Sequence, residues 1–335
     1  MSVIPATAQA WRFPIDQSTW NGHKSLERCD ILISKGLYPR PYSTGPDGQE
    51  LIPSCDGAGE VVAVGEDVTQ WKKGGPVHSF YETWFEGPVR DKYIPLTVGS
   101  GTSGCLAQYR VFDAKTLIPI PPHLSYEEAF TIACAAVTTL HSFFEKRSIT
   151  KDSTVLVLGS GGVSVFGAQL AKAAGARVIA TTSSKEKEAE YKPLGRVMEL
   201  TGGNGVEQVL EVGESQSYST YLIRANMSSL PRWAKYPYAV AELGQAWRLR
   251  APVFGTNYGE LNFEASIYPL PNDGSVRMSG MLVGSKVMCK RLDMFMSEHK
   301  IKPVVDRVLG WTKVVEALDY QLGGSHFGKV VIKID

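Results

Sequence analysis

A glycine-rich turn, Gly159-Ser-Gly-Gly-Val-Ser164, has the residue types and spacing of a phosphate-binding loop. Gly159 and Gly161 stand at the first two glycine positions of the G-x-G-x-x-G pattern, and Ser164 stands at the third. The first glycine permits a tight turn, and the second lets the backbone approach a pyrophosphate. The N–H groups and dipole at the start of a following helix favour the phosphate charges. The turn therefore predicts a dinucleotide site, with Gly162 and Val163 as further contacts.

The segments around this turn are those that a dinucleotide site needs. Residues 155–158 form a continuous apolar run, as expected of a parallel strand buried on both faces. Apolar residues at helical spacing follow the turn until Gly175, and a second apolar run covers residues 177–181. This order predicts a right-handed parallel βαβ unit, with a later strand at 206–212. A serine at the third glycine position adds only a hydroxymethyl group. An ordinary βα turn without a ligand is the alternative.

The end of the second strand indicates which nicotinamide cofactor is bound. Sites that prefer NAD place an acid about 20 residues after the first glycine, where it binds the ribose 2′-hydroxyl. Here the first acid is Glu186, and hydroxyls and a lysine come before it: Thr181, Thr182, Ser183, Ser184 and Lys185. Hydroxyl and ammonium groups hold a 2′-phosphate, whereas an acid repels it. Thr182, Ser183, Ser184 and Lys185 therefore predict NADP(H). Alternatively, Ser184 only caps the next helix.

The composition argues against several other classes of partner. Lys and Arg number 35 against 34 Asp and Glu, so no excess positive charge attracts nucleic acid or an anionic membrane. No window is apolar for the length of a membrane span, and the first residues show no secretion signal. The five cysteines are odd in number and widely spaced, which favours reduced thiols in the cytoplasm. The six scattered histidines indicate no metal cluster.

The chain changes character near residue 120. Before it, short β-like runs predominate, and residues 60–65 and 107–112 are strand candidates. After it, Ser125 and Glu128 form a capping box that predicts a helix to about Phe144. A weak pattern indicates a helix near 238–247. Toward the C-terminus we expect a strand within 276–284, a helix from 286 to 299 and a strand at 327–334.

Several stretches together resemble the medium-chain dehydrogenase/reductase superfamily, in the branch of zinc-type alcohol-dehydrogenase-like proteins near the quinone oxidoreductases. They follow one another in the order typical of the family: 30–39, 56–65, 124–129, 134–139, the glycine segment, 282–285, 301–307 and 326–332. The resemblance implies an α/β fold, with a Rossmann doubly wound parallel sheet and a GroES-like β-rich catalytic domain. The catalytic domain would span 1–120 and be completed by 287–335. The Rossmann domain would span 121–286.

Three segments depart from the family pattern by apparent deletions. The stretch from Trp11 to Asp30 is too short for two further strands, and residues 195–201 are too short for another strand and loop. Residues 214–271 replace an expected helix and a glycine-led strand with an unpatterned segment. Missing strands would leave sheet edges unpaired. These departures bear on whether the enzyme is active.

The zinc ligands of the family are present here only by substitution. The resemblance places Glu27, with Cys29 nearby, at the first catalytic ligand, Cys55 at the histidine and Cys134 at the last ligand. Together with Asp56 these groups are chemically suited to a tetrahedral site. The alternative interpretation makes Cys134 a small buried residue and Cys55 a turn residue. We expect no zinc at this position and assign no metal ligand.

The resemblance also implies roles for a few further residues. Thr138 and Cys134 are candidate catalytic residues, while Asp30 and Asp56 are expected to be structural. Val283 and Ser285 are expected to contact the cofactor, and a homodimer is expected by analogy. Three functions remain open: an NADP(H)-dependent reductase of small carbonyls, quinones or enones without zinc, a zinc alcohol dehydrogenase, and a nucleotide-binding homologue with impaired catalysis.

Overall fold

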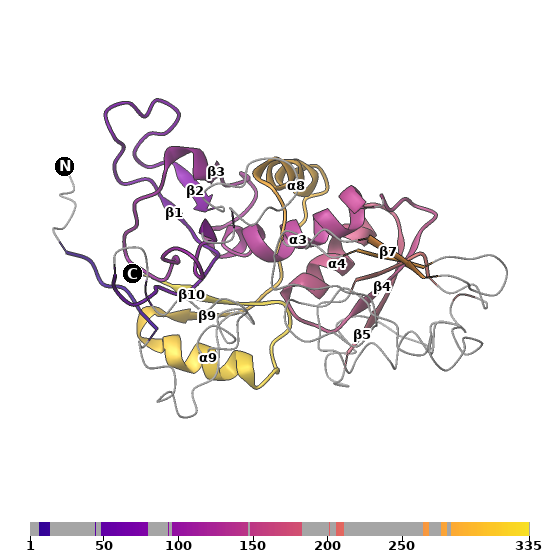
Figure 1. The fold of residues 1–335 in the computed structure, drawn as a ribbon. Helices are drawn as coiled ribbons and strands as arrows, with labels where there is room; N and C mark the ends of the chain where they lie inside the picture. The colour runs from indigo at the N-terminus through magenta and orange to yellow at the C-terminus, as the bar shows by residue number, and fades with distance from the viewer. Residues whose placement is uncertain are drawn as a thin grey trace. The chain divides into compact units, whose positions relative to one another are not determined.

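A computed structural model gives the structure of the chain (Figure 1). It describes residues 7–13, 44, 48–79, 93, 96–146, 148–182, 201, 206–210, 264–267, 276–279 and 283–334. The chain divides into two compact units. The first comprises Met1–Val137 and Ser285–Asp335, and the second comprises Thr138–Gly284. The sequence places the border between the two domains at residue 121. In the structure the two units divide between Val137 and Thr138, inside the helical run described below.

The first unit carries a small antiparallel sheet. Its strands are β1 (Ala58–Glu60), β2 (Pro76–Ser79) and β3 (Leu117–Pro119), with β2 in the middle. A short 3-10 helix, η2 (Ala114–Thr116), leads into β3 and is capped by the side chain of Asp113. The central strand β2 carries His78, whose side chain is fully buried.

The C-terminal segment completes the first unit. It contains, in chain order, α8 (Lys286–Glu298), β9 (Val305–Gly310), the 3-10 helix η7 (Trp311–Lys313), α9 (Val314–Leu322) and β10 (Lys329–Lys333). Strands β9 and β10 are parallel, and α9 connects them. One hydrophobic core joins buried residues of both chain segments: Ile52, Leu106, Val314, Ala317, Leu318 and Ile332. Burial of these apolar side chains holds the two ends of the chain in one unit.

A helical run connects the sheet of the first unit to the second unit. It consists of α2 (Tyr126–Ala129), the π-helix η3 (Ile132–Ala136), α3 (Val137–Leu140) and the π-helix η4 (His141–Lys146). The predicted capping box is confirmed, because the Ser125 N–H donates to Glu128 Oε2 at 2.8 Å and the Glu128 N–H donates to Ser125 Oγ at 3.2 Å. The predicted helix is therefore present, although wide π turns interrupt it.

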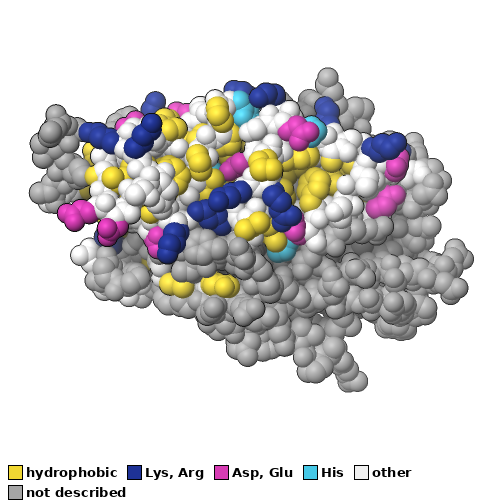
Figure 2. Space-filling model, turned by 90° about the horizontal axis from the view of Figure 1, so that it is seen from above, with side chains coloured by type: hydrophobic (Ala, Val, Ile, Leu, Met, Phe, Trp, Pro, Cys, Tyr) yellow, Lys and Arg dark blue, Asp and Glu magenta, His cyan; other side chains and the backbone are white. Residues whose placement is uncertain are grey.

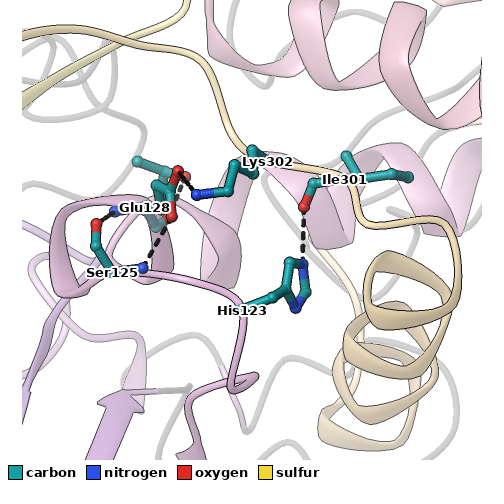
Figure 3. Close-up of polar contacts among 6 residues, drawn as sticks. His123, Ser125, Glu128, Ile301 and Lys302 are labelled. Carbon is teal, nitrogen blue, oxygen red and sulfur yellow. Dashed lines mark hydrogen bonds and ion pairs between the residues drawn. The ribbon is translucent and has the colours of Figure 1, made fainter.

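The same cap anchors the C-terminal segment to the helical run (Figure 3). The Lys302 ammonium lies 3.2 Å from Glu128 Oε1, and a ring nitrogen of His123 lies 3.0 Å from the carbonyl oxygen of Ile301. These contacts join parts of the first unit that are far apart in the sequence.

The second unit contains the predicted βαβ motif. Strands β4 (Thr154–Leu158), β5 (Arg177–Thr181) and β6 (Gln208–Leu210) form a parallel sheet in the order β5-β4-β6. Helix α4 (Gly162–Ala173) crosses between β4 and β5, and Gly175 follows it with φ +83°. A separate antiparallel pair, β7 (Glu264–Ile267) and β8 (Val276–Ser279), completes the described part.

Strand β4 is buried on both faces, as its apolar run predicts. Val155 and Val157 pack in one core with Phe143 and Leu210, and the alternate residues Leu156 and Leu158 pack in another core with Ile179. Alternate residues of a strand point to opposite faces of the sheet. A central strand covered on both sides therefore needs a continuous run of apolar residues.

Two of the expected strands are wrong. Within 60–65, pairing continues only to Val61, which bonds with Gly74 and Gly75, while Val62 and Val64 are exposed. Within 107–112, Ala107 makes a single bridge with Ala10, and Val111 is 94% exposed. In both places, strand pairing among the described residues ends before the expected run does. The helix near 238–247 and most of the three shortened segments lie outside the described residues.

Charged side chains of both signs are spread over the face that Figure 2 shows. Lys and Arg as well as Asp and Glu side chains lie there among hydrophobic and other uncharged groups. In the described part of the chain, no helix has the length and apolar character needed to cross a membrane.

Candidate cofactor and active-site residues

The glycine turn has the backbone geometry that a pyrophosphate site requires. Gly159 adopts φ +87°, which side chains disfavour, and its N–H donates to the Thr181 carbonyl at 3.0 Å. Gly161 is the N-cap of α4 and supplies no side chain to cap the helix. Among the residues that the structure describes, nothing lies within 4 Å of the place that a Cβ on Gly161 would occupy. The start of α4 is therefore open to an anionic ligand.

Ser164 acts differently from a third glycine. Its buried hydroxyl donates to the Leu158 carbonyl at 2.7 Å, which joins the first turn of α4 to the end of β4. Close packing of helix on sheet occurs instead at Gly167, where a Cβ would lie 2.6 Å from Leu210 Cδ2. In the G-x-G-x-x-G pattern the third glycine allows this close packing, and here Gly167 takes that part instead.

A second tie to the turn comes from the helical run. The buried Thr139 hydroxyl donates to the Val163 carbonyl at 3.1 Å, and Val163 packs against the core around Phe143. Thr139 was not singled out from the sequence, whereas its neighbour Thr138 was. Thr138 is half-buried in α3. The proposed catalytic role of Thr138 stays a prediction.

The carboxyl end of β5 lies beside the glycine turn, because Gly159 bonds to Thr181. Thr182 follows directly and is half-buried. Parallel α/β sheets bind ligands at this edge, outside the carboxyl ends of their strands. The structure thus brings Thr182 and the turn together. Ser183, Ser184 and Lys185 lie outside the described residues.

The residues predicted at 283 and 285 have clear local roles. Val283 has φ +43°, a strained conformation for a β-branched residue, and its carbonyl lies 2.8 Å from His141 Nδ1. Ser285 is the N-cap of α8, and its hydroxyl accepts from the Met288 N–H at 3.3 Å. Their contact with a cofactor stays a prediction.

In the first unit, two loops cross closely beside Asp56. A Cβ on Gly104 would lie 2.0 Å from the Pro53 carbonyl oxygen, and one on Gly99 would lie 2.9 Å from the Cys55 nitrogen. Ser54 has φ +75°, and its hydroxyl donates to the Asp56 carbonyl at 3.0 Å. Backbone packed this tightly fixes the direction in which the Asp56 side chain leaves the loop.

The Asp56 carboxylate is fully buried and accepts from two directions. Its Oδ1 accepts from the Cys134 N–H at 2.9 Å, and its Oδ2 accepts from Lys329 Nζ at 2.9 Å. Burial lowers the pKa of Lys329 to about 7. The Asp56 carboxylate opposes that shift because it stabilises the ammonium form. This pair connects the N-terminal segment, the π-helix η3 and strand β10.

The family's catalytic zinc position does not present a ready ligand set in the described residues. Both oxygens of Asp56 are engaged, Cys55 is buried and Cys134 is half-buried. In the described part, a group of three possible metal ligands lies elsewhere, and it includes none of Cys55, Asp56 and Cys134. Glu27 and Cys29 lie outside that part. No reaction step is therefore assigned to zinc at this position.

Comparisons with known proteins agree with this architecture. Residues 23–122 match the alcohol dehydrogenase GroES-like domain, and residues 175–332 match the zinc-binding dehydrogenase family. A zinc-type alcohol dehydrogenase-like protein of Schizosaccharomyces pombe is 32% identical over 329 residues, which cover 93% of this chain and 88% of that protein. The chain belongs to the medium-chain dehydrogenase/reductase superfamily. It is an oxidoreductase of that family, with a GroES-like and a Rossmann domain.

Three further proteins match at lower identity. A quinone oxidoreductase of Pseudomonas aeruginosa is 27% identical over 72% of this chain and 68% of its own length. A 2-methylene-furan-3-one reductase of Solanum lycopersicum is 28% identical over 84% of this chain and 63% of its own length. The crystal structure of a candidate alcohol dehydrogenase from Sinorhizobium meliloti 1021 matches with a TM-score of 0.70 and 28% identity, over 92% of this chain and 88% of that one.

Proposed function

We propose that this chain is an NADP(H)-dependent reductase of a small quinone, enone or related carbonyl compound, acting without zinc at the Cys55 and Cys134 positions. The observation that carries the proposal is the glycine turn, with its open approach at Gly161 and the uncapped start of α4. The names of two relatives, a quinone oxidoreductase and a furanone reductase, support this substrate class.

The preference for NADP(H) rests on the residues after β5. Thr182 stands at the edge of the sheet beside the turn, and two serines and a lysine follow it in the sequence. These groups provide hydrogen bonds and one positive charge for a ribose 2′-phosphate. No carboxylate stands in this stretch before Glu186, so nothing there repels the phosphate.

The choice of acceptor follows from the chemistry that the residues allow. NADPH, when bound, supplies a hydride to an electron-poor carbon of the substrate. A quinone or enone is already activated, so the oxyanion that develops needs only hydrogen-bond donors or water. Oxidation of a simple alcohol instead requires stabilisation of an alkoxide, for which a metal is well suited. Because Asp56 is engaged with Lys329 and Cys134, it is not a free base for that reaction.

Cofactor choice is tested by quenching of tryptophan fluorescence with NADPH and with NADH. The wild-type protein should bind NADPH far more tightly. The double variant Ser184→Asp/Lys185→Ala should reverse the order, because it adds a repelling charge and removes an attracting one. Lys172→Ala, which removes an exposed lysine from the last turn of α4, is the matched control and should keep the wild-type order. Equal affinity for both cofactors in the wild type would contradict the assignment.

Turnover is tested by NADPH oxidation with a panel of quinones and enones, with and without a chelator. We expect oxidation with at least one acceptor, in the presence of the chelator as well as in its absence. Activity only with alcohols and NADP⁺, lost in Cys134→Ser together with bound zinc, would instead support the zinc alcohol dehydrogenase that the name of the Schizosaccharomyces pombe relative suggests. Binding of NADPH without any turnover would support a nucleotide-binding homologue.

A further inference from the structure

Three potential metal ligands meet in the interior of the first unit. His78 lies on the central strand β2, and Cys289 and Asp293 lie four residues apart on one face of α8. A ligand atom of each lies within 4.8 Å of the others. His78 and Cys289 are 0% exposed and Asp293 is 9% exposed. Figure 1 shows α8 beside the strands β2 and β3 of this unit.

The polar atoms of this cluster are incompletely satisfied. His78 Nδ1 and Asp293 Oδ1 are buried and have no hydrogen-bond partner within the described part of the chain. Buried polar atoms of this kind are rare in proteins and cost free energy, so a missing ion or water is a usual explanation. One ion can use only one ring nitrogen of His78, so the unpartnered Asp293 carboxylate oxygen beside the buried Cys289 thiol is the atom that points to a bound cation.

The contact between His78 and Asp293 also has the spacing of two ligands of one ion. His78 Nε2 lies 3.3 Å from Asp293 Oδ2, which is long for a charge-assisted hydrogen bond. Two nitrogen or oxygen ligands at zinc distances, in tetrahedral geometry, lie about 3.3 Å apart. Cys289 Sγ lies within 4.8 Å of the ligand atoms of both residues.

We propose that His78, Cys289 and Asp293 bind one zinc ion that fastens helix α8 to strand β2. Imidazole, thiolate and carboxylate are all zinc ligands, and three protein ligands leave a fourth position for water. The site shares no residue with Cys55, Cys134 or Asp56, and it does not depend on the proposed reductase activity. Since His78 and Asp293 are 215 positions apart, the ion would join the two chain segments of the unit.

The test is the zinc content of the purified full-length protein, measured by elemental analysis with matched cysteine variants. We expect one zinc per chain in the wild type, in Cys105→Ser and in Cys134→Ser, and less than a tenth of an equivalent in Cys289→Ser. Cobalt reconstitution should give a thiolate-to-cobalt charge-transfer absorption that Cys289→Ser lacks and Cys134→Ser keeps. Circular dichroism establishes that each variant is folded, and Asp293→Asn serves as a second variant with the thiol intact.

A chelator provides an independent measurement. It should lower the midpoint of thermal unfolding of the wild type and of Cys134→Ser, and leave that of Cys289→Ser unchanged, because an ion that binds only the folded state stabilises it. Absence of zinc and cobalt binding in the wild type would overturn the proposal. So would zinc that Cys134→Ser loses and Cys289→Ser retains, since that result places the ion at the family's position.

Discussion

Lys329 on β10 donates to Asp56 Oδ2 at 2.9 Å, and both side chains are buried although 273 positions separate them in the sequence. The other oxygen of the carboxylate accepts from the backbone of Cys134. One ion pair thus joins a loop before β1, the π-helix η3 and the last strand. Such a pair stabilises a fold only while both partners are present.

Lys329→Met should lower the free energy of unfolding by about 3–5 kcal/mol, because it leaves the Asp56 charge buried and uncompensated. The double variant Asp56→Asn/Lys329→Met should recover most of this loss, since asparagine keeps an oxygen for the Cys134 N–H. Urea unfolding measures both values. Lys333→Met, at an exposed position of the same strand, is the control and should cost less than about 1 kcal/mol. A double variant no more stable than the single one would contradict this account.

Stability should rise with pH above neutrality through Lys329. Its pKa in the folded chain is about 7, against 10.5 ordinarily, so between these values the unfolded chain binds more protons. The free energy of unfolding then increases with pH by up to about 1.4 kcal/mol per unit. We would measure urea unfolding at intervals from pH 6 to pH 9. The free energy of unfolding should rise more steeply with pH in the wild type than in Asp56→Asn/Lys329→Met. Parallel curves for the two proteins would mean that Asp56 keeps Lys329 charged.

Two glycine-to-alanine variants should separate cofactor binding from stability. Gly161→Ala places a methyl group in open space at a compatible backbone conformation, so it should cost less than about 1 kcal/mol of stability and weaken NADPH binding at least tenfold. Gly167→Ala forces a contact with Leu210 and should cost about 1–3 kcal/mol. Fluorescence titration and urea unfolding measure the two effects. Similar NADPH affinity in Gly161→Ala and wild type would place the pyrophosphate elsewhere.

Ser164→Ala should destabilise the protein by about 0.5–1.5 kcal/mol, because it removes the hydroxyl that donates to the Leu158 carbonyl. NADPH affinity should stay within about threefold of the wild type, since that hydroxyl is already engaged with the Leu158 carbonyl at the end of β4. The same unfolding and titration experiments apply. A large loss of affinity without a loss of stability would show that Ser164 contacts the cofactor directly.

The βαβ unit could be predicted because its signals are local. An uninterrupted apolar run can be buried only in a strand covered on both faces, and β4 is such a strand. The glycine turn, the stop at Gly175 and the capping box at Ser125 each depend on residues within a few positions of one another. The predictions of strands at 60–65 and 107–112 were wrong because strand pairing is not a local property. A β-like run of residues does not reveal whether another segment lies beside it to pair with.

The sequence by itself determined the family, the glycine turn and the hydroxyl-rich end of β5, because these depend on residues that are neighbours in the chain. Only the tertiary structure decided which distant groups meet. It paired Asp56 with Lys329, assigned the close helix–sheet contact to Gly167, and brought His78 to Cys289 and Asp293. The physical reason is that burial makes such groups interact strongly, whereas their sequence separation leaves no local pattern.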